Sequence, residues 1–387
     1  MTLWIGILFV VFLAALSAFY LLLRSRNMQM WFPSYVRRQR RQPIQGPTHV
    51  LFCFVDHFEP MWARPDYETE CRRVKRWVDE YGAMANRHRD ADGLPPGHCF
   101  FYPEEEYRKE HLDGVVEICR QGFGEIDVHL HHDNDTAEGL TEKLQRFRKI
   151  LHETHNALPV NDKGEPVYGF IHGNWCLDNA RPDGRYCGVN NELQVLAECG
   201  CYVDYTFPAA PDPSQTPTIN QIYYATDDPQ KPRSHDHGVR VKAGGSASGD
   251  LMLIQGPLML NWRDRKLGLI PRIENGDIRA GQEPSPQRTD LWVEANVHIQ
   301  GRPEWVFIKV HTHGTQEAST DVLLGDPVDA MYSDLESRYN DGENYVLHYV
   351  SSREMYNIAK AAEAGLDGDP NQYRDYVYKK PEFSPPG

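Results

Sequence analysis

Three histidines and three acidic or amide residues stand within the seven residues from His129 to Asp135, which read His-Leu-His-His-Asp-Asn-Asp. Imidazole and carboxylate groups are the side chains that bind zinc and similar divalent ions in proteins. The string follows the strand-like segment 126–128, so its first residues are expected at the end of a strand. The pattern predicts a metal site or a proton-transfer site at this point of the chain.

Similar polar strings end other short apolar runs of the sequence. Asp56-His57 follows 50–55, His172-Gly-Asn174 follows 167–171, and His311-Thr-His313 follows 307–310. The carboxyl ends of parallel strands meet at one end of an α/β barrel, where active sites are found. These strings are therefore expected to converge with 129–135 on one site.

The residues from 129 to 135 are expected to divide between metal binding and helix capping. His129 is predicted to bind the metal, and His131 lies on the same side of the strand because side chains alternate. His132 and Asp133 are reached only if the chain turns there. Residues 135–136 are predicted instead to cap the following helix.

Two further groups of residues are predicted to contact substrate. Asn174 can donate a hydrogen bond to an oxyanion, and Trp175 offers a face on which a sugar ring can stack. With His172, they form either a substrate-binding group or an ordinary polar strand end with a core tryptophan. Arg272, in Pro271-Arg-Ile-Glu-Asn275, lies either in a substrate cleft or in a surface ion pair.

The remaining strings predict proton transfer. Of the adjacent residues Asp56 and His57, one can bind a metal while the other handles a proton, or the pair is a helix cap beside a packed histidine. His311 and His313 share one face of their strand, and an imidazole there suits a general acid because its ordinary pKa is near neutrality.

The elements that must position these residues alternate along the chain from residue 48. Strands are predicted at 50–55, 126–130, 167–171, 202–206, 222–225, 251–255, 291–299, 305–310 and 345–350. Helices are predicted at 67–89, 104–120, 136–156, 190–199, 327–339 and 352–364. The alternation favours a parallel α/β fold, a barrel above all, over residues 48–364. An irregular insertion is expected at about 207–300, and a flexible tail at 365–387.

The N-terminus predicts a membrane anchor over residues 1–24. The apolar run 3–23 is long enough to cross a hydrocarbon core of about 30 Å. No Lys or Arg precedes it, and Phe19-Tyr-Leu-Leu-Leu23 stands where a cleavage site would belong, so a retained helix is favoured over a cleaved signal peptide. The arginines of the basic linker 25–47 predict a cytoplasmic domain. They would either bind anionic lipid headgroups or be merely solvated.

Composition excludes several classes of function. The formal net charge of −14 argues against nucleic acid as a partner, because phosphate backbones need a basic surface. The eight cysteines show no Cys-x-x-Cys spacing, which excludes a zinc ribbon and fits a reducing compartment. Neither a phosphate-binding glycine loop nor a Gly-x-Ser-x-Gly elbow is present.

The order of the polar strings resembles the polysaccharide deacetylase superfamily, metal-dependent carbohydrate esterases with a distorted (β/α) barrel. Val55-Asp56-His57 is similar to the family's first motif, and Glu125-Ile-Asp-Val-His129 to the approach to its first metal histidine. The segments 190–193 and 200–204 resemble the helix and strand after its third motif. Val310-His311-Thr-His313 resembles the late strand that supplies the catalytic histidine. These short patches span about residues 48–350.

The resemblance implies a role for each matching position. Asp56 would be the general base, His57 would replace the usual second acid as a metal ligand, and His129 would be a metal ligand. His311 or His313 would be the general acid. Asp133 falls where the family has its second metal histidine, and the region of His172 replaces the third-motif arginine.

These observations predict a membrane-anchored, metal-dependent hydrolase that removes an acyl group, expected to be N-acetyl, from a sugar in surface-polysaccharide or glycolipid metabolism. One divalent ion, expected to be zinc, would be its cofactor. Its partners would be an acylated carbohydrate or glycolipid, together with membrane lipid around the anchor. One alternative is a phosphoesterase or amidohydrolase, classes that often use two metals. Another is a catalytically decayed scaffold that binds glycans.

Overall fold

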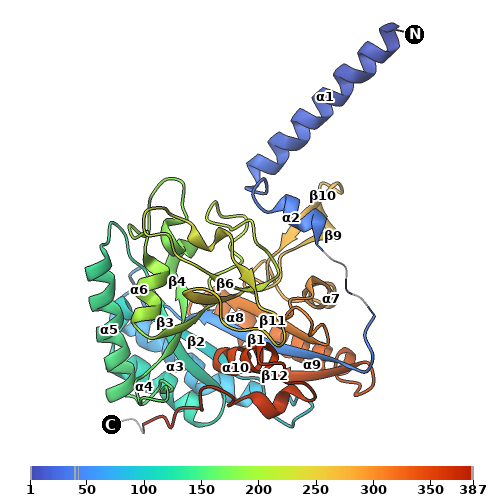
Figure 1. Cartoon of the computed structure of the whole chain (residues 1–387). Coiled ribbons are helices and arrows are strands. Elements are labelled where there is room, and N and C mark those ends of the chain that lie inside the picture. The colour runs from blue at the N-terminus through green and yellow to red at the C-terminus, as the bar shows by residue number, and fades with distance from the viewer. Residues whose placement is uncertain (1, 39–40, 42, 385–387) are drawn as a thin grey trace.

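The computed structural model describes residues 2–38, 41 and 43–384. Its centre is a ten-stranded, mostly parallel sheet (Figure 1). The strands of this sheet are β1 (Thr48–His57), β2 (His98–Pro103), β3 (Gly124–Leu130), β4 (Tyr168–His172), β5 (Cys201–Asp204), β6 (Ile222–Ala225), β7 (Val239–Arg240), β8 (Leu251–Ile254), β11 (Trp305–Thr312) and β12 (Tyr345–Tyr349). The α/β class expected from the sequence is therefore confirmed.

The strand order is β11-β1-β2-β3-β4-β5-β8-β6-β7, and β12 also pairs with β1. All neighbours are parallel except the pairs that β6 forms with β7 and β8. Because β11 and β7 stand at two separate ends of this order, the sheet is open among the described residues. The distorted (β/α) barrel predicted from the sequence is not closed here, so only the α/β class with a mostly parallel sheet is confirmed.

Helices cover both faces of the sheet. The alternation of side chains sends Phe52 and Phe54 of β1 to one face, called the outer face here, and Cys53 and Val55 to the other, the inner face. The inner face packs against α10 (Ser352–Glu363). The outer face packs against α3 (Tyr67–Ala85), α4 (Lys109–Arg120), α5 (Ala137–Glu153), α6 (Glu192–Glu198), α7 (Pro286–Ala295), α8 (Glu317–Leu323) and α9 (Asp326–Arg338).

The N-terminal helix α1 (Thr2–Ser25) projects away from the body (Figure 1). It is long and apolar enough to cross a membrane, although a signal sequence would also meet these criteria. After it, the short helix α2 (Phe32–Arg37) packs on the domain through Trp31 and Tyr35, both buried. The separate hairpin of β9 (Met259–Lys266) and β10 (Ile270–Glu274) lies beside this junction.

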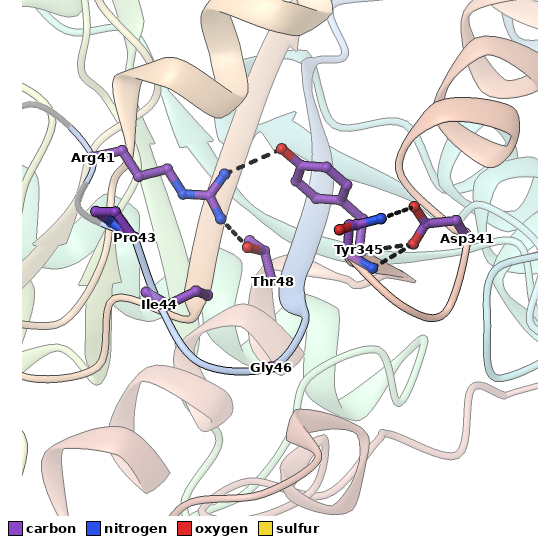
Figure 2. A pocket seen from close by; sticks show the side chains of 8 residues that line it. Arg41, Pro43, Ile44, Gly46, Thr48, Asp341 and Tyr345 are labelled. Atoms are coloured by element: carbon purple, nitrogen blue, oxygen red, sulfur yellow. Dashed lines mark hydrogen bonds between the residues drawn. The ribbon is translucent and has the colours of Figure 1, made fainter.

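The linker expected over 25–47 is thus partly built into the domain. Beyond α2, Arg41 reaches across a hollow to the hydroxyls of Thr48 and Tyr345, as Figure 2 shows. On the far side of the hollow, Asp341 accepts hydrogen bonds from the backbone amides of Asn344 and Tyr345. These contacts tie the chain that follows α1 to the starts of β1 and β12.

Two sequence-based expectations about local structure were wrong. Segment 291–299, predicted as a strand, begins inside α7, which starts with Pro286 as a first-turn proline and buries Trp292 and Val293. The tail expected to be flexible is docked as far as Ser384, whose amide donates to the carbonyl oxygen of His155 at 2.8 Å. The guanidinium of Arg353 donates to the carbonyl oxygens of Arg374 (3.0 Å) and Tyr378 (2.7 Å).

Candidate metal centre

Three pairs of residues spaced two apart meet at the carboxyl ends of β1, β3 and β11. They are His57 with Glu59, His129 with His131, and His311 with His313. His57 and His129 lie in strands that β2 joins in parallel register, and β11 pairs directly with β1. Residues two apart point to the same side of an extended chain, so each pair presents two side chains to the inner face.

Five of these side chains form one cluster, called the open site here: His57, Glu59, His129, His131 and His313. The Glu59 Oε1 atom lies 3.3 Å from His129 Nε2 and 3.5 Å from His131 Nε2. The His57 ring stacks on that of His313 at a centroid distance of 4.6 Å and lies 4.7 Å from that of His129. Potential ligand atoms lie within 4.8 Å of one another in two groups, His57–Glu59–His313 and Glu59–His129–His131. Glu59 belongs to both groups.

Hydrogen bonds orient two of the imidazoles toward the centre of the open site. His129 Nδ1 lies 2.7 Å from the carbonyl oxygen of Ile171, and His131 Nδ1 lies 2.6 Å from Glu105 Oε1. Both partners are acceptors, so each Nδ1 is placed to donate and each Nε2 points toward Glu59. Metal-binding histidines are oriented in this way by a carbonyl or carboxylate behind them. The donor set therefore fits a divalent ion such as zinc.

Burial and neighbouring charges shift the pKa values of the ligand groups in different directions. Burial, with the nearby histidines, lowers the pKa of His57 far below its usual value and that of His129 to about 3. Burial also raises the pKa of Glu59, against the pull of His313 and His131. For His131, burial lowers the pKa, but the bond to Glu105 and the charge of Glu59 outweigh it, and the net shift is upward.

The cluster is accessible from one side. The side chain of His131 is 30% exposed, whereas that of Glu59 is 7% exposed and that of His129 is fully buried. Trp175, which is partly buried, lies beside the cluster with ring centroids 6.1 Å from His57 and 5.8 Å from His313. His131 and Trp175 therefore form a partly exposed edge of the cluster.

The predicted base, Asp56, points away from this site. Its Oδ2 atom lies 2.8 Å from His98 Nε2, and its Oδ1 atom accepts a 2.6 Å bond from the amide of Gly314. The side chain is fully buried. Adjacent residues of a strand face opposite ways, so His57 enters the inner face while Asp56 enters the outer face. The geometry does not support Asp56 as a base at the metal.

Other predicted site residues also lie outside the cluster. Asp133 is exposed and accepts from the amides of Asn134 and Tyr186. The Arg272 side chain pairs with Asp264 at 2.8 Å, both about half exposed, so the surface ion pair is the correct interpretation. His311 is buried with its ring 6.4 Å from that of His57, and it belongs to neither ligand group.

The three residues of 172–175 that were expected to bind substrate do not lie together at the open site. His172 is fully buried on the outer face, beside His132. Asn174 is partly buried in the left-handed region at a φ of 54°. Of the three, only Trp175 contacts the histidines of the open site.

Two carboxylates of the site, Glu59 and Glu105, were missed by the sequence analysis. Glu59 stands two residues after His57, the spacing that joins the two histidines of 129–131. The amide of Phe58 still donates to Phe101 O at 3.0 Å, so the chain stays extended past His57 and keeps Glu59 on the same side. That spacing was the available signal. Glu105 follows β2, a strand that the sequence analysis did not predict.

A scan against models of known protein families finds no match for this chain, and a search of curated proteins finds no similar sequence. Any inference about function therefore depends on the site itself.

Proposed function

We propose that this protein is a membrane-anchored, metal-dependent hydrolase whose open site removes an acyl group, N-acetyl in the first instance, from a sugar. The observation that carries the proposal is the convergence of four imidazoles on Glu59 at the carboxyl ends of parallel strands, with one side accessible. This is the end of a parallel α/β sheet at which catalytic residues gather.

The chain's own residues supply a ligand shell, an acid and a binding face. A divalent ion held by Glu59, His129 and their neighbours would polarise the acyl carbonyl and lower the pKa of a water molecule. His313, which lies beside Trp175, is placed to protonate the leaving group, in preference to the more deeply buried His311. Trp175 offers its face to a sugar ring.

One observation favours a second candidate of the same general kind. Glu59 is shared by two groups of ligand atoms, as a carboxylate that bridges two ions would be. Two-metal sites are common in phosphoesterases and amidohydrolases. The number of ions bound at the open site separates this candidate from a one-metal deacetylase.

Contacts around α1 support a retained anchor rather than a cleaved signal. The Phe19 ring packs edge-on against Phe32 at 5.5 Å, and Arg26 donates to the carbonyl oxygen of Pro271 at 2.9 Å. Trp31, directly after this junction, is completely buried in the domain. Cleavage near residue 25 would remove the contact between Phe19 and Phe32.

The surface near α1 has the composition of a membrane contact. The tip of the β9–β10 hairpin exposes Trp262, Leu267 and Leu269, with Leu267 92% exposed, among the basic residues Arg263, Arg265 and Lys266. Aromatic and basic residues of this kind favour the headgroup region. A hollow between residues 27–30 and 179–184 adjoins the loop that carries Trp175. We therefore include a glycolipid among the proposed substrates.

Metal removal tests the activity. The full-length protein in detergent is expected to release acetate from N-acetylated lipid-linked saccharides, and a chelator should reduce the rate by at least about 10²-fold. Restoring zinc should restore the rate. Cleavage of phosphoesters in place of amides would favour the second candidate, whereas glycan binding without any hydrolysis would indicate a scaffold.

The orientation of the anchor is tested separately. The arginines after α1 predict that the domain faces the cytoplasm. Protease added to right-side-out vesicles should leave the domain intact, and protease added to inverted vesicles should digest it. The opposite pattern would place the domain outside the cytoplasm.

A further inference from the structure

A second cluster of potential ligands, the buried site, lies on the outer face of the sheet. It consists of His132, His172, Cys187 and Glu192, whose ligand atoms lie within 4.8 Å of one another. All four are buried. His132 directly follows His131, and adjacent side chains of an extended chain point to opposite faces. His132 therefore points away from the open site. The hydrolytic proposal makes no use of this cluster.

The two imidazoles and the carboxylate converge on one point. His132 Nε2 lies 2.8 Å from His172 Nε2, and Glu192 Oε1 lies 3.2 Å and 3.3 Å from these two nitrogens. The Cys187 Sγ atom lies 3.2 Å from the other oxygen of Glu192 and accepts a 3.3 Å bond from the amide of Asn179. Ligand atoms around a tetrahedral zinc ion are roughly 3.3–3.6 Å apart. The two distances from Glu192 Oε1 to the imidazoles are close to this value, whereas the two imidazole nitrogens lie closer together.

Hydrogen bonds behind the imidazoles orient the Nε2 atoms of His132 and His172 toward each other and toward Glu192. His132 Nδ1 lies 2.9 Å from Asp135 Oδ2, which also accepts from Lys143, and His172 Nδ1 faces the carbonyl oxygen of Gly173. Both partners are acceptors, so each Nδ1 is placed to donate and each Nε2 points toward Glu192. Two imidazole nitrogens and a carboxylate oxygen gathered this closely in a buried space need a shared proton or a cation between them.

We propose that His132, His172, Cys187 and Glu192 hold a structural zinc ion. Two neutral imidazoles, one thiolate and one carboxylate balance the charge of Zn²⁺, so the filled site is neutral, as its burial requires. Four protein ligands leave no position for substrate, which is the mark of a structural site. This arrangement distinguishes it from the accessible open site.

The ion would fix a strained loop next to the open site. Between His172 and Cys187 the chain places Asn174, Trp175 and Tyr186 in the left-handed region, at φ of 54°, 53° and 73°. A tryptophan or tyrosine adopts this conformation only when its surroundings impose it. Ligands at both ends of the segment would provide that constraint and hold Trp175 against His57 and His313.

Cobalt substitution and metal analysis of the full-length protein test the site. Cobalt-loaded wild-type protein is expected to show a thiolate-to-cobalt charge-transfer band in the near ultraviolet. Cys187→Ser should abolish the band and lose one equivalent of metal. Cys176→Ser is the matched control, because Cys176 is a buried thiol of the same loop that lies outside the ligand group. The Cys176→Ser protein should keep the charge-transfer band and its full metal content.

A variant of the open site keeps the two proposals distinguishable. Glu59→Gln should lose metal from the open site and keep the cobalt–thiolate band, even if the hydrolytic function proves wrong. A folded, cobalt-loaded wild-type protein without the band, or a Glu59→Gln protein that retains no metal at all, would overturn the buried zinc site. These two measurements use the wild-type and Glu59→Gln proteins, so the proposal can still be tested if Cys187→Ser fails to fold.

Discussion

Glu59→Gln is expected to remove metal from the open site and to reduce hydrolysis by at least about 10²-fold, without unfolding the protein. Glu59 is the one side chain common to both groups of potential ligands, and a carboxylate can provide a negative charge, which an imidazole cannot. Glutamine keeps the shape of the side chain and removes that charge. Metal analysis beside an activity assay and a thermal melt measures the three quantities separately.

The neighbouring carboxyl group of Glu106 provides the matched control. Burial raises the pKa of Glu106 to about 8, so this group is protonated at neutral pH and Glu106→Gln changes little of its charge. Its 2.6 Å bond from the amide of Met61 can be kept by the amide oxygen of glutamine. Glu106→Gln is expected to keep its metal. Equal metal loss in both variants, or none in Glu59→Gln, would contradict the assignment of Glu59 as a ligand.

The sequence predicted which strands supply the site, but not which face each side chain takes. His129 and His131 were correctly predicted to lie on the same side, because the alternation of side chains along a single strand determines this. Asp56 and His57 were both assigned to the site, although adjacent strand residues cannot share a face. Applying the same alternation at every strand end would have selected Glu59 and separated His131 from His132.

The ligands of the buried site were beyond the reach of the sequence. Cys187 lies in a loop and Glu192 is the first residue of α6, both far along the chain from His132, and no spacing rule joins them. Their proximity results from the docking of this loop against β3 and β4. The sequence also could not predict that the sheet is open, because strands and helices alternate in the same way in an open sheet and in a barrel.

The strand β2 shows a third limit. His98-Cys-Phe-Phe-Tyr-Pro103 is buried at every position, so it lacks the alternation of polar and apolar residues that marks a half-exposed strand. Because the strand β2 was not predicted, the sequence analysis identified neither His98, the partner of Asp56, nor Glu105, the partner of His131.

Asp56→Ala is expected to destabilise the fold by about 3–5 kcal/mol, because it leaves the buried His98 imidazole and the Gly314 amide without their partner. The carboxylate joins the end of β1 to the start of β2 and to the turn that carries His313. A side chain in this position holds the site together without contacting substrate. Chemical denaturation of the variant and of the wild-type protein measures the difference.

Asp56→Asn separates this positioning role from the base that the family resemblance implies. Asparagine can still accept the bond from the Gly314 amide, so we expect a loss of stability of about 1–3 kcal/mol, with metal content and most of the activity retained in the folded protein. A general base cannot be replaced by an amide, and its loss would reduce the rate by about 10²–10⁴-fold at unchanged metal content. A stable, metal-loaded and inactive Asp56→Asn protein would therefore restore Asp56 as the base and require its side chain to turn toward the inner face during catalysis.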